Sequence, residues 1–514
     1  MQVYRVVAAV IYFYSIPIQA YNILIVLPYQ GKSHHVAFQP LFKELAKRGH
    51  NVTVISHYPQ EKPVKNLYDI PLSDIKQSFL NWVPVRSPSY FNIFTIGIGL
   101  VYTGASSCKI LLSNKGVQDL WKNHAKFDVI LVEQFNSDCP LGLAYTLGAP
   151  VVGLTSNSLM PQHYKRYGIP DNPSFTRNQV LGGKIKGSLF ERIERTLIGL
   201  YINYMVDYMC QFIDSYYMRQ YIPNIPSIKE LEKNIKFLLL YQNFVLNGAL
   251  LLPSNVIQVA GHHVIEPKPL PKDLGTFMKE SKHGVIYISF GSLLKAASIP
   301  SYKLKAILDV LEKLPQRVIW KWDNEPLPFK LDKIYSAPWL PQNDIMAHPK
   351  LVAFFSHCGQ AGITEAIHYG IPVIGIPMFG DQVSNAAAVE ESGLGVQTTL
   401  DEITSENLLL KFKTILDPNF RQKVKNLSRM YRDMPISSLD TAVFWTEFAG
   451  RYPNASFRSP VLNVPLYQYY GLDILSVFLL LILVIFMFLK SMLCFLLSYI
   501  RFRVKKRKQK KKSQ

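Results

Sequence analysis

The chain has 514 residues, of which 48% are hydrophobic, 12% aromatic and 18% charged, and its formal net charge is +20. The composition excludes a disordered chain, and the length predicts two domains, because single hydrophobic cores stop growing well below this size. Nucleic acid is not an expected partner, because nine of the Lys and Arg residues lie between Arg501 and Lys512 and no aromatic-basic alternation typical of RNA binding is present.

Five cysteines are widely spaced along the chain, at Cys108, Cys139, Cys210, Cys358 and Cys494. There is no CxxC pair, so the sequence predicts no zinc site and no other metal centre. At most one or two disulfide bonds are expected.

Residues 1–20 are predicted to be a signal peptide. Arg5 is a basic flank, the next nine residues form an apolar run, and Ala20 is small enough to precede a cleavage site. The alternative is a buried first strand. The signal peptide is favoured because an apolar strand, Ile23–Leu27, follows immediately.

At the opposite end of the chain, the apolar run predicts a transmembrane helix over residues 474–497. A basic cytosolic tail is expected to follow over residues 498–514. Because positive flanks stay in the cytosol, the residues before the helix are expected in the lumen. Lys511 and Lys512 stand at the positions of a dilysine retrieval signal, which predicts a single-pass type I protein of the endoplasmic reticulum. Lumenal sequons begin at Asn51, Asn426 and Asn454, and they predict a glycoprotein.

Between these ends, residues 21–252 alternate apolar strands with helical patterns. The predicted strands are Ile23–Leu27, Val52–Ser56, Phe127–Val132 and Val151–Leu154. A turn is expected over Pro28–Ser33, and a helix over Val36–Arg48 that Gly49 caps. Such alternation predicts a parallel sheet with helices on both faces.

The middle segment, Lys184–Ile222, is rich in Tyr, Phe and Met and is predicted to be helical. It could line an apolar cavity, lie against a membrane, or be plain core. Residues 253–275 contain four prolines and no periodicity, which predicts a linker.

A second alternating unit spans residues 276–455. Its predicted strands are Val285–Phe290, Val318–Trp322, Ile334–Ala337, Val352–Ser356 and Val373–Ile376. The whole pattern therefore predicts an α/β protein with two doubly wound domains that face a cleft. Ligands in such sheets bind at the carboxyl ends of the strands.

Turns rich in small residues follow three of these strands, after Phe290, Ser356 and Ile376. Small residues let backbone N–H groups approach an anion, and a helix N-terminus favours negative charge. Each turn alone is a weak signal, but together they indicate a site for a nucleotide diphosphate.

Residues 339–382 read WLPQNDIMAHPKLVAFFSHCGQAGITEAIHYGIPVIGIPMFGDQ. This stretch resembles the donor-binding signature of the UDP-glycosyltransferase family. Nearly the whole chain is similar to the animal membrane-bound members of this family, and most of all to the insect members. The resemblance implies the GT-B fold, two Rossmann-like domains, a single membrane span and a UDP-sugar as co-substrate.

The resemblance also implies roles for matching positions. Trp339 would stack on uracil, Gln342 would contact uracil or ribose, and Glu365 would accept from ribose hydroxyls. This sequence departs from many relatives at Ala361 and Gly362, whose side chains cannot donate a hydrogen bond. Phosphate contact there would rest on backbone N–H groups.

The remaining donor positions surround the diphosphate and the sugar. His357, with Ser292 and Gly359, would hold the diphosphate, and Asp381 and Gln382 would bind sugar hydroxyls. Helix dipoles and His357 would then carry the leaving-group charge without a metal.

Residues 31–56 resemble the start of the family's acceptor domain. By this register His34 is the general base that takes the proton of an acceptor hydroxyl, a task that suits imidazole because its pKa lies near neutrality. His35 is the neighbouring alternative. A carboxylate is expected to orient the base, and the candidates are Glu133 and, five residues on, Asp138.

The resulting hypothesis is an inverting hexosyltransferase that moves a sugar, expected to be glucose, from a UDP-sugar to a hydroxyl of a small lipophilic acceptor, as in detoxification. Glucuronosyl transfer, glycosylation of membrane lipids and a non-catalytic glycoprotein that keeps the fold are the alternatives. No cofactor is expected beyond the UDP-sugar, and homo-oligomers are left open.

Overall fold

The computed structural model describes residues 20–72, 83–177, 179–181, 187–323 and 332–512. The predicted signal peptide, residues 1–20, therefore lies almost wholly outside the described residues. Contacts divide the chain into two compact units, residues 1–458 and residues 459–514. Each unit is described by itself.

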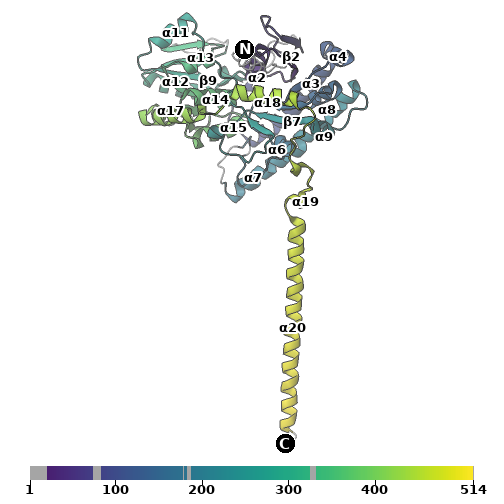
Figure 1. Ribbon diagram of the computed structural model, residues 1–514. Helices are drawn as coiled ribbons and strands as arrows, with labels where there is room; N and C mark the ends of the chain where they lie inside the picture. Colours follow the sequence, from purple (N-terminus) through teal and green to yellow (C-terminus); the bar gives the residue numbers. More distant parts are fainter. Residues whose placement is uncertain (1–19, 73–82, 178, 182–186, 324–331, 513–514) are drawn as a thin grey trace, which may run out of the picture. The chain divides into compact units, whose positions relative to one another are not determined.

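The described residues of the first unit form two large parallel sheets and one small sheet of two strands. Strands β2, β7 and β9 of the large sheets are labelled in Figure 1. The first sheet has seven strands, which in spatial order are β3 (Leu67–Pro71), β2 (Asn51–Ser56), β1 (Asn22–Leu27), β5 (Val129–Glu133), β6 (Val151–Leu154), β7 (Ile235–Leu240) and β8 (Val256–Gln258). The second has six, which are β12 (Ile334–Ala337), β11 (Arg317–Lys321), β9 (Val285–Ser289), β13 (Leu351–Ser356), β14 (Val373–Gly375) and β15 (Gly395–Gln397). The strands predicted from the apolar runs are confirmed to within two residues.

Both faces of each sheet are buried, which is why the strands read as continuous apolar runs. In β1 and β5, Leu24 and Ile130 pack into one core, whereas Ile23 and Val129 pack into another on the opposite face. The second sheet divides its side chains between two cores in the same way. The sequence prediction of two doubly wound domains is therefore confirmed.

Helices cover these faces. Those that precede the second sheet are α2 (Lys32–Lys47), α3 (Tyr90–Ser113), α4 (Lys115–Lys122), α5 (Cys139–Leu147), α6 (Pro161–Tyr167), α7 (Leu189–Leu200), the π-helix η1 (Tyr201–Val206), α8 (Asp207–Tyr221), α9 (Ile228–Leu231), the 3₁₀ turn η2 (Glu232–Asn234) and α10 (Phe244–Asn247). Those that accompany it are α11 (Lys272–Lys279), the 3₁₀ turn η3 (Ala296–Ser298), α12 (Ser301–Lys313), α13 (Gln342–Ala347), α14 (Gln360–Tyr369), α15 (Gln382–Glu391), α16 (Ser405–Leu416), α17 (Pro418–Arg432) and α18 (Ser438–Arg451).

Two predicted boundaries differ from the structure. The expected linker, residues 253–275, contains β8 and the start of α11, and β8 extends the first sheet. The three residues of β8 are too few to show the alternation of a strand, so the four prolines of this segment led to the prediction of a linker. In addition, α18 falls within the predicted second domain, residues 276–455, yet it packs against α2 and the first sheet (Figure 1).

Other segments also tie the two sheets together. The short strand β4 (Val83–Pro84) comes from the first half of the chain and pairs with β10 (Leu294–Lys295) of the second half. Val85, the next residue, is buried in a core of the second sheet. The chain therefore crosses between the two lobes several times.

The start of α2 also differs from the prediction. The helix begins at Lys32, inside the segment expected as a turn over Pro28–Ser33. It ends at Lys47, and Gly49 adopts a φ of 96°, as expected for a residue that follows a helix. His34 therefore lies in the first turn of a helix rather than in a loop.

The middle segment, where it is described, forms α7, η1 and α8. Tyr204, Tyr208 and Phe212 are exposed, whereas Ile202 and Val206 are buried. Plain core is therefore the wrong interpretation for much of this segment. Cys108 of α3 and Cys139 of α5 form a disulfide bond, within the one or two that the sequence allowed.

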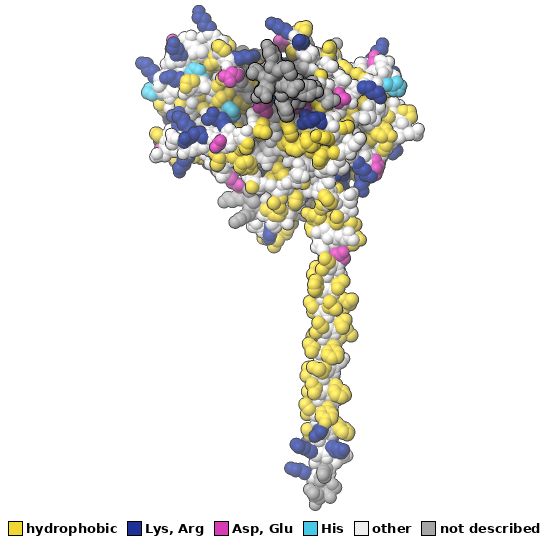
Figure 2. Space-filling model, viewed as in Figure 1, with side chains coloured by type: hydrophobic (Ala, Val, Ile, Leu, Met, Phe, Trp, Pro, Cys, Tyr) yellow, Lys and Arg dark blue, Asp and Glu magenta, His cyan; other side chains and the backbone are white. Residues whose placement is uncertain are grey.

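The second unit consists of the 3₁₀ turn η4 (Pro460–Asn463), α19 (Leu466–Tyr469) and the long helix α20 (Leu472–Lys512). Figure 2 shows hydrophobic side chains along most of α20 and Lys and Arg side chains near its end. An 18-residue stretch of this helix has a mean hydropathy of 3.0 and is not buried. Among the described residues, α3 is the other helix long and apolar enough to cross a membrane, but 33% of its apolar stretch is buried and it packs against α8.

Candidate active site

His34 lies at the carboxyl end of β1 and contacts Glu133, the last residue of β5. Its Nδ1 atom is 2.6 Å from Oε1 of Glu133, and the two side chains are 15% and 1% exposed. Strands β1 and β5 are neighbours in the parallel sheet, so their ends bring the two residues together. Because a carboxylate only accepts hydrogen bonds, Nδ1 carries the proton and Nε2 keeps its lone pair.

Ser156 completes this group, and the sequence analysis did not find it. Its hydroxyl lies 2.8 Å from Oε1 of Glu133, to which it donates, and 2.8 Å from Nδ1 of His34. It follows β6, the next strand in the sheet. A serine after an apolar strand is common, so only the tertiary contact distinguishes it.

Aromatic rings hold the imidazole in place. The rings of Tyr29 and Phe135 lie 4.5 Å and 4.7 Å from the His34 ring, centroid to centroid. Gly31 makes this packing possible, since a Cβ atom there would lie 2.5 Å from the Tyr29 ring. The side chain of His34 is therefore fixed on several sides.

The neighbouring histidine has a different environment. His35 is 4% exposed and packs against Phe42 and Tyr58. Burial lowers the pKa of His35 to about 4. The geometry thus separates the two alternatives and leaves His34 as the imidazole beside the carboxylate.

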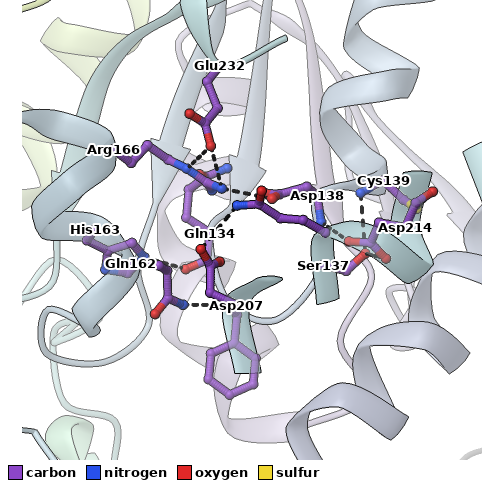
Figure 3. A network of polar contacts seen from close by, with 12 residues as sticks. Gln134, Ser137, Asp138, Cys139, Gln162, His163, Arg166, Asp207, Asp214 and Glu232 are labelled. Atoms are coloured by element: carbon purple, nitrogen blue, oxygen red, sulfur yellow. Dashed lines mark hydrogen bonds and ion pairs between the residues drawn. The ribbon is translucent and has the colours of Figure 1, made fainter. Parts of the chain in front are cut away.

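Asp138, the second candidate carboxylate, lies in another network (Figure 3). Its Oδ2 atom is 2.8 Å from the guanidinium of Arg166, which also pairs with Glu232 at 2.9 Å. The backbone N–H of Asp138 donates to Asp214 over 2.5 Å. Asp138 therefore fixes the loop that follows Glu133 and does not contact His34.

The same region contains the one group of possible metal ligands found among the described residues, which is Cys108, Cys139 and Asp214. The two cysteines are disulfide-bonded, so neither offers a thiolate to a metal ion.

The turns after β9 and β13 meet around His357, because these strands are neighbours in the second sheet. The His357 ring fills the space between Gly291 and Gly359, where added Cβ atoms would lie 2.5 Å and 2.6 Å from Nε2. Ser292 is in the same turn as Gly291. Burial lowers the pKa of His357 to about 4, so the imidazole is neutral near pH 7. It carries no charge of its own, and it is already hydrogen-bonded to the backbone of Ser289.

Helix α14 starts at this point, with Gly359 as its N-cap residue. Its first residue, Gln360, is 4% exposed, and neither side-chain amide atom has a hydrogen-bond partner among the described residues. Buried amides are normally satisfied, so Gln360 is a further candidate for ligand contact. Gln360 was not predicted from the sequence, because only Ala361 and Gly362 differ there from the side chains that many relatives of the family carry.

Gln342 of α13 contacts Glu365 of α14, and Trp339 lies three residues before Gln342. The Trp339 side chain is 51% exposed. Gln342 donates to the carboxyl of Glu365 and accepts from the hydroxyl of Tyr287 over 3.2 Å. Burial raises the pKa of Glu365 to about 8, although the Gln342 hydrogen bond lowers it, and donors such as ribose hydroxyls would favour the ionised form.

Asp381 and Gln382 form the start of α15 and face the first lobe. The amide of Asn385 donates to Asp381 over 2.9 Å and to the carbonyl of Cys358 over 3.1 Å, which joins this turn to the His357 turn. The side-chain oxygen of Gln382 accepts from two backbone N–H groups of its own loop. Burial raises the pKa of Asp381 to about 6, while the nearby His34 lowers it.

Two cavities flank this region. The first is lined almost entirely by apolar side chains of α3 and η1 and by the loop of Met378, Phe379 and Gly380 from the other lobe. The second contains Phe135, Asp138 and Arg166, and both cavities share Leu100, Ile202 and Val206. The aromatic middle segment thus lines a cavity with its buried side. The sequence left this possibility open.

Solved structures with this architecture are glycosyltransferases. The glycotransferase of kitacinnamycin matches with a TM-score of 0.58 and 16% identity, over 84% of this chain and 99% of that one. LpCGTa in complex with UDP matches with a TM-score of 0.55 and 16% identity, over 85% and 100%. The chain has the GT-B fold, as the resemblance predicted.

The family model "UDP-glucoronosyl and UDP-glucosyl transferase" matches residues 22–510. UDP-glucosyltransferase 2 of Dactylopius coccus is 34% identical over 479 residues, which cover 92% of each chain. Human UDP-glucuronosyltransferase 1A10 is 28% identical over 470 residues, 88% of this chain and 87% of the relative. The chain therefore belongs to the UDP-glycosyltransferase family and is a hexosyltransferase that takes its sugar from a UDP-sugar donor.

Two carboxamide substitutions separate the roles of the two candidate carboxylates. Glu133→Gln should lower kcat by about 10²-fold or more, because the amide cannot stabilise a protonated His34. Asp138→Asn should instead lower the free energy of unfolding by about 2 kcal/mol, because the buried Arg166 loses a charged partner. Steady-state rates and urea titrations of both variants test this. A larger kcat loss for Asp138→Asn in folded protein would contradict the assignment.

Proposed function

We propose that the chain transfers glucose from UDP-glucose to the hydroxyl of a small lipophilic acceptor, with inversion at the anomeric carbon. The observation that carries the proposal is the His34–Glu133 hydrogen bond beside Asp381, which leaves Nε2 of His34 as the free basic atom. The other lobe approaches this pair through Asp381, which lies near His34, and through Trp339, which contacts Lys32.

The reaction is a single displacement. Nε2 of His34 takes the proton of the acceptor hydroxyl as its oxygen bonds to the anomeric carbon, and the bond from that carbon to the diphosphate oxygen breaks. The electron pair leaves with UDP. Glu133 stabilises the resulting imidazolium, and the backbone N–H groups at the start of α14 stabilise the departing diphosphate.

Glucose is favoured over glucuronate by the comparison with relatives. The UDP-glucosyltransferase of Dactylopius coccus is 34% identical, whereas the human glucuronosyltransferase is 28% identical. A glucuronate carboxylate also needs a cation, and the groups expected around the sugar, Asp381 and Gln382, offer none. Glucuronosyl transfer remains the second candidate, and UDP-glucuronate serves as the competing donor in the test below.

The acceptor is proposed to occupy the two cavities, the second of which is lined by Phe135, whose ring packs on His34. The first cavity offers almost no polar atoms, which suits an apolar ring system. The second offers Asn136, Gln162 and Arg166 to a polar substituent. Phenols and similar hydroxylated ring compounds combine both features. Ceramide and other membrane lipids are the alternative acceptors.

Helix α20 is proposed to anchor the protein in the endoplasmic reticulum membrane, with the first unit in the lumen. The apolar length of the helix and the nine basic residues at its end support this orientation. Asn51, Asn426 and Asn454 are all exposed, so each could carry a glycan.

The first test is a donor screen with a simple phenol on wild type and His34→Ala. Wild type should form the glucoside from UDP-glucose and less product from UDP-glucuronate, measured by mass spectrometry. His34→Ala should lose about 10²–10⁴-fold in rate, because the general base is gone, and should still bind UDP. His35→Ala is the matched control, and an equal loss there would contradict the assignment of the base.

The acceptor cavity can be narrowed without touching the donor site. Leu100 lines both cavities, so Leu100→Trp should raise KM about tenfold for bulky phenols, leave KM for UDP-glucose unchanged, and spare phenol itself. Tyr102→Trp is the control, since Tyr102 is 75% exposed on the same helix. Equal KM values for small and bulky phenols in the Leu100 variant would refute the placement.

The affinity for UDP-glucose should depend on pH through Asp381. Burial raises the pKa of Asp381 to about 6, so the carboxylate that accepts sugar hydroxyls is present above this pH and is protonated below it. Affinity measured by calorimetry should therefore fall as the pH drops through about 6. Asp381→Asn should bind more weakly and lack this inflection. The same inflection in both proteins would assign it to another group.

A further inference from the structure

Lys32 reaches across the opening from the first lobe to the second. Its ammonium lies 3.9 Å from the centroid of the Trp339 ring, a cation–π contact between the first residue of α2 and the ring expected to stack on uracil. The contact joins the two lobes two residues before His34. The sequence placed all donor contacts in the second lobe, so this contact was not anticipated.

The charges around the phosphate turns show why a cation from the first lobe matters. His357 is neutral near pH 7, because burial lowers its pKa to about 4. Departure of UDP puts negative charge on the diphosphate. A neutral imidazole and helix N–H groups stabilise this charge only through their dipoles. A positively charged side chain nearby would add to this stabilisation.

Lys321 is a second lysine near the phosphate turns. It ends β11, beside β9, whose turn contacts His357. Lys32 is among the charges that lower the pKa of Lys321, after burial, and Lys321 in turn lowers that of His357. Lys32 thus contacts the Trp339 ring and lies near enough to Lys321 for the two charges to interact. Two close ammonium groups repel each other, and an anion between them relieves the repulsion.

We infer that Lys32 is a donor-binding residue supplied by the acceptor lobe, held on Trp339 until uracil takes its place on the ring and then paired with the diphosphate. A flexible four-carbon stem allows this short movement. The contact already joins the two lobes close to His34, and the bound donor would replace it. This inference rests on the proposed function, because it requires UDP in the second lobe.

The test compares UDP with uridine, which has the base and ribose but no phosphate. Calorimetry on the full-length protein in detergent should show that Lys32→Gln weakens UDP binding about tenfold and leaves uridine binding unchanged or tighter, because the ring is freed while the phosphate partner is lost. The salt dependence of UDP binding should also become shallower. Lys32→Arg should retain most of the affinity.

Lys47→Gln is the matched control, since Lys47 lies in the last turn of the same helix and its side chain is 78% exposed. Equal weakening of UDP and uridine by Lys32→Gln would overturn the inference in favour of a structural role, and no change with either ligand would overturn it outright. If wild type binds no UDP, the proposed function fails instead. The two failures are therefore distinguishable.

Discussion

The hydrogen bond between the His34 imidazole and the buried Glu133 carboxylate is the interaction on which the rest of the site depends. It fixes which nitrogen carries the proton, and so which atom faces the acceptor. Much of the surrounding structure holds this pair. The parallel pairing of β1 and β5 sets the distance, the ring of Phe135 packs on the imidazole, and the Asp138–Arg166 pair anchors the loop that follows Glu133.

The second lobe meets this pair with turns that are small, buried and short of positive charge. Glycines at 291 and 359 leave room for the neutral His357 ring, and Asn385 ties the Asp381 turn to the Cys358 turn. Such a site binds an anion through hydrogen bonds and a helix N-terminus rather than through fixed charges. The role proposed for Lys32 would add a cation from the opposite lobe once the donor is bound.

Much of this was readable in the sequence, since apolar runs of four to six residues followed by small-residue turns predict parallel strands with a ligand edge. That pattern gave most strands of both sheets to within two residues. It missed β3, β7, β8 and β15, of which β8 and β15 have only three residues and so show no period. It also ended the first domain without α18, because sequence distance hides the packing of that helix on α2. His34 was placed in a loop because the helix start carries no capping side chain.

The sequence by itself determined the class of fold, the family and the donor-signature positions, because periodicity and motif register are local properties. Only the tertiary structure decided which carboxylate meets His34, which histidine is buried, and that Ser156 joins the pair, since each choice depends on which strand ends are neighbours. It alone brought Lys32 to Trp339. Contacts between residues hundreds of positions apart arise from the packing of the two lobes, and no local pattern encodes them.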